Sequence, residues 1–120
     1  MANHLYQGDL PDSLNLGPVV AIDTETMGLD PRRDRLCVVQ LSDGSGNAHL
    51  ATGVAAQTPA LATVSPAEGT TFVQIGRLLA DPAVLKLFHY GRFDIAVLKA
   101  AFGVRTAPVW CTKIASKLIR

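Results

Sequence analysis

A short apolar run that ends in two acids most constrains the fold of this chain. Residues 19–29 read Val-Val-Ala-Ile-Asp-Thr-Glu-Thr-Met-Gly-Leu, and residues 19–22 have the apolar character of a strand covered on both faces. Side chains two residues apart share one face of a strand, so we expect Asp23 and Glu25 to point the same way. Their mutual repulsion would be relieved by a hard divalent cation, Mg²⁺ or Mn²⁺. The structural alternative is that one acid caps a turn while the other faces water.

A third acid follows a second strand. Leu85, Leu87 and Phe88 indicate a short buried strand, and apolar side chains then recur at helical spacing between residues 93 and 102. This pattern places Asp94 in the first turn of a helix, where an acid also has a purely structural role at the positive end of the helix dipole. Functional groups of open α/β sheets collect beyond the carboxyl ends of strands, so two strands that each end at an acid indicate a site.

Several segments carry a family resemblance, in the same order and with matching spacing. The segments are residues 22–29 (Ile-Asp-Thr-Glu-Thr-Met-Gly-Leu), residues 34–41 and residues 88–98 (Phe-His-Tyr-Gly-Arg-Phe-Asp-Ile-Ala-Val-Leu). They resemble the first two exonuclease motifs of ribonuclease D and its relatives in the DEDD superfamily. The tail at residues 111–118 resembles the segment that follows the second motif in compact bacterial members of the nano-ribonuclease C type. The resemblance covers most of the chain outside residues 51–72.

This resemblance implies a fold, a reaction and a set of metal ligands. The implied fold is α/β and ribonuclease H-like: a mixed sheet of three antiparallel strands followed by alternating helix and strand, flanked by helices. The implied reaction is metal-dependent 3′–5′ exonucleolytic hydrolysis of the 3′-terminal phosphodiester of RNA or short oligoribonucleotides. In the family four carboxylates hold two Mg²⁺ or Mn²⁺ ions, and Asp23, Glu25 and Asp94 match three of them as catalytic, metal-binding residues. Two such ions can stabilise both the attacking and the leaving oxygen.

Six further residues are candidates for contact with the substrate. They are Met27, Gly28, Leu29, His89, Arg92 and Phe93. The first three form the turn beside the metals, where Leu29 either packs on the terminal base as an apolar wedge or staples onto the core. His89 contacts a phosphate or the scissile region, or has a structural role at its strand end. Arg92, two residues from Asp94, favours a substrate phosphate, whereas Phe93 either stacks on a base or is buried under the helix.

The third motif of the family is missing from these residues. That motif places a Tyr or His four residues before a last Asp on a late helix, but no acid follows Asp94 here. Tyr90 precedes Asp94 by the right count but belongs to the second motif. We therefore expect residues 1–120 to be one partial exonuclease domain, truncated at its C-terminus, from a longer nuclease. The alternative is a non-catalytic nucleic-acid-binding or oligomerisation module on the same fold.

The charge is unevenly distributed along a chain whose net charge is only +1. Residues 82–120 contain seven bases and one acid, whereas residues 1–81 contain four bases and nine acids. The basic segment either lines a path for phosphates or forms solvated helix faces. We expect a nucleic-acid partner, RNA before DNA, although a choice between the two depends on a pocket for the 2′-hydroxyl.

The sequence gives no sign of a membrane or of export. It has no uninterrupted apolar stretch of 18 residues, and its first ten residues lack a basic and an apolar signal region. We therefore expect no membrane partner and a cytoplasmic location. Apolar area left exposed on the late side of the sheet would favour self-association into a homo-oligomer.

Local patterns predict the order of elements. Strands are expected at 19–25 and 36–42, at either 48–52 or 71–75, and at 85–89 and 108–110; helices are expected near 76–80, at 92–102 and from residue 112. Residues 51–72 are rich in Ala, Thr and Pro and predict a mobile surface loop, either an inert insertion or a lid.

Overall fold

The computed structural model describes residues 2–28, 30, 34, 36–52, 73–89 and 91–112. Within these residues the chain alternates between strands and helices in an α/β order. The elements are β1 (Asn3–Gln7), β2 (Val19–Thr26), β3 (Leu36–Ser42), β4 (Ala48–Thr52), α1 (Val73–Ala80), β5 (Leu85–Phe88), α2 (Gly91–Phe102) and β6 (Val109–Cys111). No helix in this described part of the chain is both long and apolar enough to cross a membrane.

The described strands form one mixed sheet in the order β1-β4-β3-β2-β5-β6. β3 runs antiparallel to both of its neighbours, β2 and β4, whereas the β1–β4, β2–β5 and β5–β6 pairs are parallel. Three antiparallel strands followed by alternating helix and strand is the expected fold class, which is confirmed. β1 was not predicted, because Asn-His-Leu-Tyr-Gln has one strongly apolar residue at its centre and no alternating pattern to mark it as a strand.

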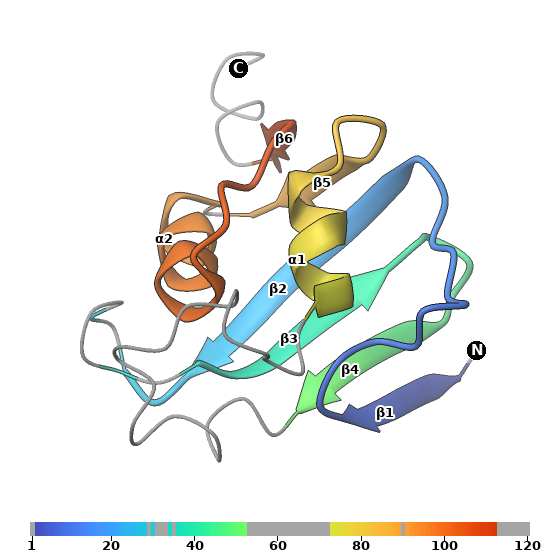
Figure 1. Ribbon diagram of the computed structural model, residues 1–120, viewed down its shortest axis with the longest axis horizontal. Helices are drawn as coiled ribbons and strands as arrows, with labels where there is room; N and C mark the ends of the chain where they lie inside the picture. The colour runs from blue at the N-terminus through green and yellow to red at the C-terminus, as the bar shows by residue number, and fades with distance from the viewer. Residues whose placement is uncertain are drawn as a thin grey trace.

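Helices α1 and α2 lie on the same face of the sheet (Figure 1). The side chains of β2 alternate accordingly, with Val20, Ile22 and Thr24 buried on the covered face. The core between helices and sheet is apolar. It consists of Leu10, Leu16, Val20, Ile22, Leu36, Val39, Leu41, Ala51, Ile75, Leu79, Phe88, Val97, Leu98 and Phe102.

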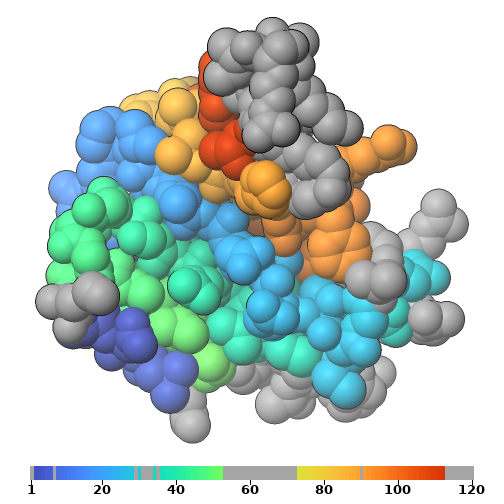
Figure 2. Space-filling view, turned by 180° about the vertical axis from the view of Figure 1, so that it is seen from behind, coloured from blue at the N-terminus to red at the C-terminus, as the bar shows by residue number. Residues whose placement is uncertain are grey.

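The opposite face of the sheet carries the other half of each strand. Figure 2 shows this face from behind, with β2, β3 and β4 at the surface between the two edges of the sheet. On β2 it exposes Val19, Ala21, Asp23 and Glu25. The pleat thus separates two apolar residues and two acids from the core on the helix side.

A carboxylate from a distant loop fixes the start of α1. Asp9, just after β1, accepts hydrogen bonds from the backbone N–H groups of Gln74 (2.6 Å) and Ile75 (3.0 Å). The first N–H groups of a helix have no partner within the helix, so an acid placed there satisfies two of them and complements the helix dipole. The β1–β2 connection is therefore tied to α1.

The expected strands agree with the structure to within a residue or two, with one choice settled. The third strand is β4, Ala48–Thr52, and not the alternative at 71–75, because α1 begins at Val73. The proposed mobile loop at 51–72 is wrong for residues 51 and 52, which belong to β4, and residues 53–72 lie outside the described part. The helix expected from residue 112 also lies outside it beyond Thr112.

One member of the predicted basic surface is buried. Lys86 on β5 has no exposed area, and its ammonium donates hydrogen bonds to the carbonyls of Asp81 (2.6 Å) and Ala107 (2.7 Å). Strand alternation places Lys86 on the same face as Phe88, under the helices. Lys86 therefore cannot line a phosphate path, and its charge ties β5 to the loops on either side.

Candidate active site

Asp23 and Glu25 lie near the C-terminal end of β2, on the face that α1 and α2 do not cover. Both side chains are exposed, and Thr24 between them points into the core. The expectation that the two acids share one face is confirmed by this alternation. In the antiparallel register Asp23 lies opposite Gln40 and Glu25 opposite Val38, so β3 presents one polar and one apolar neighbour.

Asp94 reaches the same end of β2 from α2. β5 pairs with β2 along Val19–Ala21, and beyond that point no strand among the described residues pairs with this edge of β2. The first turn of α2 comes to this edge, where the Thr24 hydroxyl donates a 2.5 Å hydrogen bond to Oδ1 of Asp94. Asp94 is buried, with 4% of its area exposed.

The environment of Asp94 disfavours a negative charge. Burial raises the pKa of the Asp94 carboxyl above its ordinary value of 3.8, and the hydrogen bond from Thr24 opposes that effect. The charges of Asp23 and Glu25 raise the pKa of Asp94 further. Asp23 and Glu25 therefore lie close enough to Asp94 for their charges to oppose its ionisation, and a bound cation would relieve that repulsion.

The three carboxylates are suitable ligands for a hard divalent cation, but their arrangement is not that of a complete metal site. Carboxylate oxygens are the ligands that Mg²⁺ and Mn²⁺ prefer. Asp94, however, is engaged with Thr24 on the helix side, while Asp23 and Glu25 face the other way. Among the described residues no group of three acids, histidines or cysteines is already arranged around one point. The assignment of Asp23, Glu25 and Asp94 as metal ligands stays a prediction.

The turn after β2 is held by local contacts. The Thr26 hydroxyl donates to the carbonyl of Gly28, and the carboxylate of Asp34 accepts a 2.9 Å hydrogen bond from the N–H of Asp30. A side chain at position 28 would collide with that carboxylate, which explains the glycine. Met27 projects into solvent with 71% of its area exposed, whereas Leu29 lies outside the described residues.

The candidate substrate residues of the second motif divide between surface and core. His89 and Arg92 are exposed, beside the end of β5 and the start of α2. Phe93 is half-buried and packs against the core, so of its two interpretations the structural one has the direct support. The ring of His89 lies 2.9 Å, through Nδ1, from the hydroxyl of Thr112.

Sequence reasoning missed both threonines that hold these groups. The sequence contained a signal for Thr24, because a hydroxyl at an inward strand position between two acids can donate a hydrogen bond to a third acid. Thr112 had none, because it lies 23 residues from His89 and meets it only through the pairing of β5 with β6.

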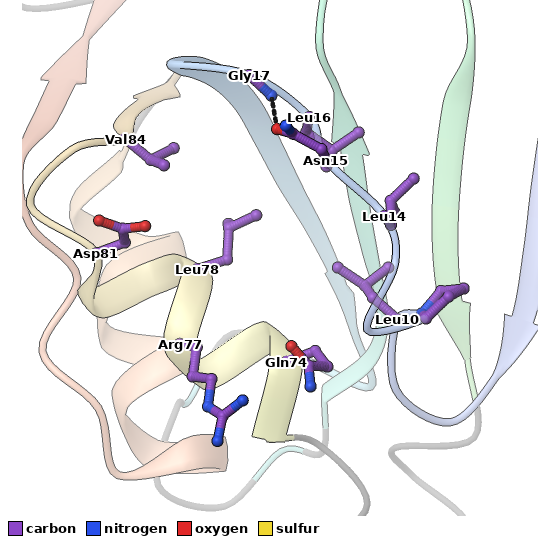
Figure 3. Close-up of a pocket in the computed structure, with 11 residues that line it drawn as sticks. Leu10, Leu14, Asn15, Leu16, Gly17, Gln74, Arg77, Leu78, Asp81 and Val84 are labelled. Carbon is purple, nitrogen blue, oxygen red and sulfur yellow. Dashed lines mark hydrogen bonds between the residues drawn. The ribbon is translucent and has the colours of Figure 1, made fainter.

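Two cavities can be compared with these residues. A hollow of about 480 Å³ on the helix-free face begins at Asp23 and is lined by Ala21, Ile22, Asp23, Gln40, Ser42, Leu87, Phe88, His89 and Thr112. A smaller one, about 200 Å³, lies between the β1–β2 loop and α1. Figure 3 shows the smaller one, with Leu10, Leu14 and Leu16 on the side of the β1–β2 loop and Arg77 and Leu78 on the side of α1. It contains none of the three motif acids, so we place the candidate site at the larger hollow.

Comparison with known proteins assigns the family. A family model described as 3′–5′ exonuclease matches residues 9–120. The chain belongs to this 3′–5′ exonuclease family. Ribonuclease D of Acidiphilium cryptum is 37% identical to this exonuclease domain over 107 residues, which are 89% of this chain and 24% of the relative. The resemblance to ribonuclease D is therefore confirmed.

Solved structures extend the match to the fold. Brucella melitensis NrnC with bound Mg²⁺ is 45% identical with a TM-score of 0.81, and the match covers 98% of this chain and 53% of NrnC. The same protein bound to pGG gives 45% identity and a TM-score of 0.80, over 98% of this chain and 52% of that one. The chain thus spans about a quarter of its ribonuclease D relative and about half of NrnC.

Proposed function

We propose that this exonuclease-family domain belongs to a metal-dependent 3′–5′ exonuclease that hydrolyses the 3′-terminal phosphodiester of RNA, with short oligoribonucleotides as its substrates. The observation that carries the proposal is that Asp23, Glu25 and Asp94, the acids of the first two motifs, all lie at one end of β2 in a chain of this family. The Mg²⁺ and pGG complexes of Brucella NrnC support the choice of metal and of a short substrate.

Asp23, Glu25 and Asp94 would hold the ions. When bound, two divalent ions supply a water of lowered pKa and neutralise charge that builds up on the phosphate. Thr24 holds Asp94 at the edge of β2 and satisfies its carboxylate in the buried position. Only Oδ1 of Asp94 takes part in that bond, so Oδ2 would be the oxygen that binds a cation while the hydroxyl positions the carboxylate.

The exposed residues around the acids bind and orient the nucleotide. Arg92, at the start of α2, is placed to neutralise a backbone phosphate next to Asp94. Met27 and the Gly28 turn offer an apolar side chain and close backbone approach to the terminal base. His89 lines the wall of the hollow that begins at Asp23. These four residues act through contact with substrate.

The experiment compares single-residue variants of one polypeptide, the parent protein, which contains residues 1–120 together with a Tyr-x-x-x-Asp or His-x-x-x-Asp segment. Asp23→Asn keeps the side-chain volume but removes a charge that the ions need, so it should abolish Mn²⁺- or Mg²⁺-dependent release of mononucleotides from a 3′-labelled oligoribonucleotide. Asp12→Asn, an exposed acid in the β1–β2 loop, is the matched control and should leave the rate unchanged. Equal turnover by the Asp23 variant and the parent protein would refute the assignment.

A second candidate is a non-catalytic RNA-binding module. The observation in its favour is that Asp94 is bonded to Thr24 on the helix side while Asp23 and Glu25 face the opposite side of the sheet, so that the described residues do not gather the three acids around one point. Under the leading proposal, a polypeptide that contains residues 1–120 together with a Tyr-x-x-x-Asp or His-x-x-x-Asp segment should hydrolyse RNA when metal is present. RNA binding without metal-dependent hydrolysis by that polypeptide would select the second candidate.

A further inference from the structure

The imidazole of His89 contacts a threonine hydroxyl. Nδ1 of His89 lies 2.9 Å from Oγ1 of Thr112, and the same hydroxyl donates a 3.2 Å hydrogen bond to the carbonyl of Phe88. The sheet brings these groups together, because β5 and β6 are parallel neighbours in which Phe88 pairs with Cys111. His89, the residue after β5, therefore lies beside Thr112, the residue after β6.

The two contacts of this hydroxyl determine where the proton of His89 lies. A threonine hydroxyl has one hydrogen and two lone pairs, and a backbone carbonyl can only accept. If the hydroxyl donates to Phe88, it can take part in the contact with His89 only as the acceptor. Nδ1 must then be the donor, and the lone pair of the neutral ring is on Nε2.

The position of this pair ties it to the candidate active site. His89 and Thr112 form part of the wall of the hollow that begins at Asp23. His89 is exposed, and its strand, β5, is the parallel neighbour of β2, which carries the acids. A change in the orientation of this ring therefore changes the wall of the hollow.

We propose that Thr112 is a positioning residue for the exonuclease reaction, which fixes the ring of His89 in the Nδ1-protonated form at the wall of the hollow. A neutral ring of this kind carries no proton at Nε2 and cannot donate there to a phosphate oxygen. The proposal rests on the proposed function for its catalytic consequence. Its structural part, the tautomer, is independent of activity.

The tautomer can be read directly. Two-bond ¹H–¹⁵N correlation spectra of the uniformly labelled protein distinguish histidines protonated at Nδ1 from those protonated at Nε2, and His89→Gln assigns the signal. We expect the Nδ1-protonated form in the parent protein and in Thr112→Ser, and its loss in Thr112→Val. Protonation of neutral His89 at Nε2 in the parent protein, or an unchanged tautomer in Thr112→Val, would overturn the proposal.

Kinetics on a short 3′-labelled oligoribonucleotide test the positioning role. Thr112→Val should lower kcat/KM roughly tenfold to a hundredfold, the range that a misplaced active-site group produces. Thr112→Ser should restore most of that loss. Thr52→Val removes a comparable hydroxyl, which donates to the carbonyl of Tyr6 at 3.0 Å, and should leave kcat/KM unchanged.

A double-mutant cycle separates positioning from a general effect on the fold. In a His89→Ala background, Thr112→Val should add little further loss, because the ring on which it acts is gone. A full additional loss in that background would overturn the positioning role. If the parent protein shows no metal-dependent hydrolysis, the proposed function is overturned, and so is the catalytic role of Thr112. The tautomer spectra test separately whether Thr112 fixes the ring of His89.

Discussion

The hydroxyl of Thr24 donates a 2.5 Å hydrogen bond to the carboxylate of Asp94, across 70 positions of the sequence. This contact joins the two exonuclease motifs: the inward side chain of the first meets the acid of the second at the edge of β2. Asp23 and Glu25 flank Thr24 on the other face, and their charges act on the same carboxylate. The site is thus built around a strand edge, with acids reaching it from both sides of the sheet.

Thr24→Val should destabilise the metal-free protein by about 1–3 kcal/mol, because a buried carboxylate loses its hydrogen-bond donor. The valine side chain keeps the shape of threonine, so packing changes little. Urea unfolding at neutral pH measures the loss. Thr24→Ser, which keeps the hydroxyl, is the control and should retain more of the stability. Equal free energies of unfolding for the parent protein and the Val variant would contradict the role given to this hydrogen bond.

Asp9→Ala should destabilise the protein by about 0.5–2 kcal/mol, the usual effect of removing a helix cap. The carboxylate of Asp9 accepts from the backbone of both Gln74 and Ile75, so its loss leaves two N–H groups of α1 without this partner. In native-state hydrogen exchange, the backbone amides of α1 should be the first to exchange faster. Asp12→Ala, in the same loop but exposed, is the control. Identical exchange rates in α1 for both variants would exclude the cap.

These two contacts mark the limit of what the sequence could predict. Local patterns were sufficient for β2, β3, β5 and α2, since apolar spacing and glycine breaks depend on near neighbours. They also predicted that Asp23 and Glu25 share a face. The burial of Lys86 and the capping of α1 by Asp9 depend on partners brought together by the sheet, and no local pattern encodes them. The orientation of Asp94 toward Thr24 has the same origin, because it requires β5 to end before β2 does.

Lys86→Met should destabilise the protein by about 1–3 kcal/mol at neutral pH, because two part-buried carbonyls lose a charged donor. Burial also lowers the pKa of the Lys86 ammonium below its ordinary value of 10.5, and the charge of Asp81 opposes this effect. The unfolded chain therefore keeps this proton at pH values where the folded protein has lost it.

The sign of the pH dependence follows from that difference in proton binding. The penalty for the buried charge is fully present below the lowered pKa of the folded state, and it is relieved as pH rises toward 10.5. The stability of the parent protein relative to Lys86→Met should thus increase across this window. Urea unfolding at several pH values from 7 to about 10.5 measures it. Lys99→Met, at an exposed position of α2, is the control and should show no such trend. A parent-minus-variant difference that falls as pH rises would contradict the burial of the charge.

Mn²⁺ should raise the melting temperature of the parent protein, because a ligand that binds only the folded state stabilises it by mass action. At about 100 times its Kd the stabilisation is roughly 2.7 kcal/mol, enough for a shift of several degrees in a domain of this size. Asp23→Asn and Glu25→Gln should each lose most of the shift, since each removes an exposed carboxylate from the same face of β2. Asp12→Asn should keep it, and Ca²⁺ at the same concentration tests the preference for the smaller ion. A shift that survives both substitutions would place the cation elsewhere and would remove Asp23 and Glu25 from the metal site.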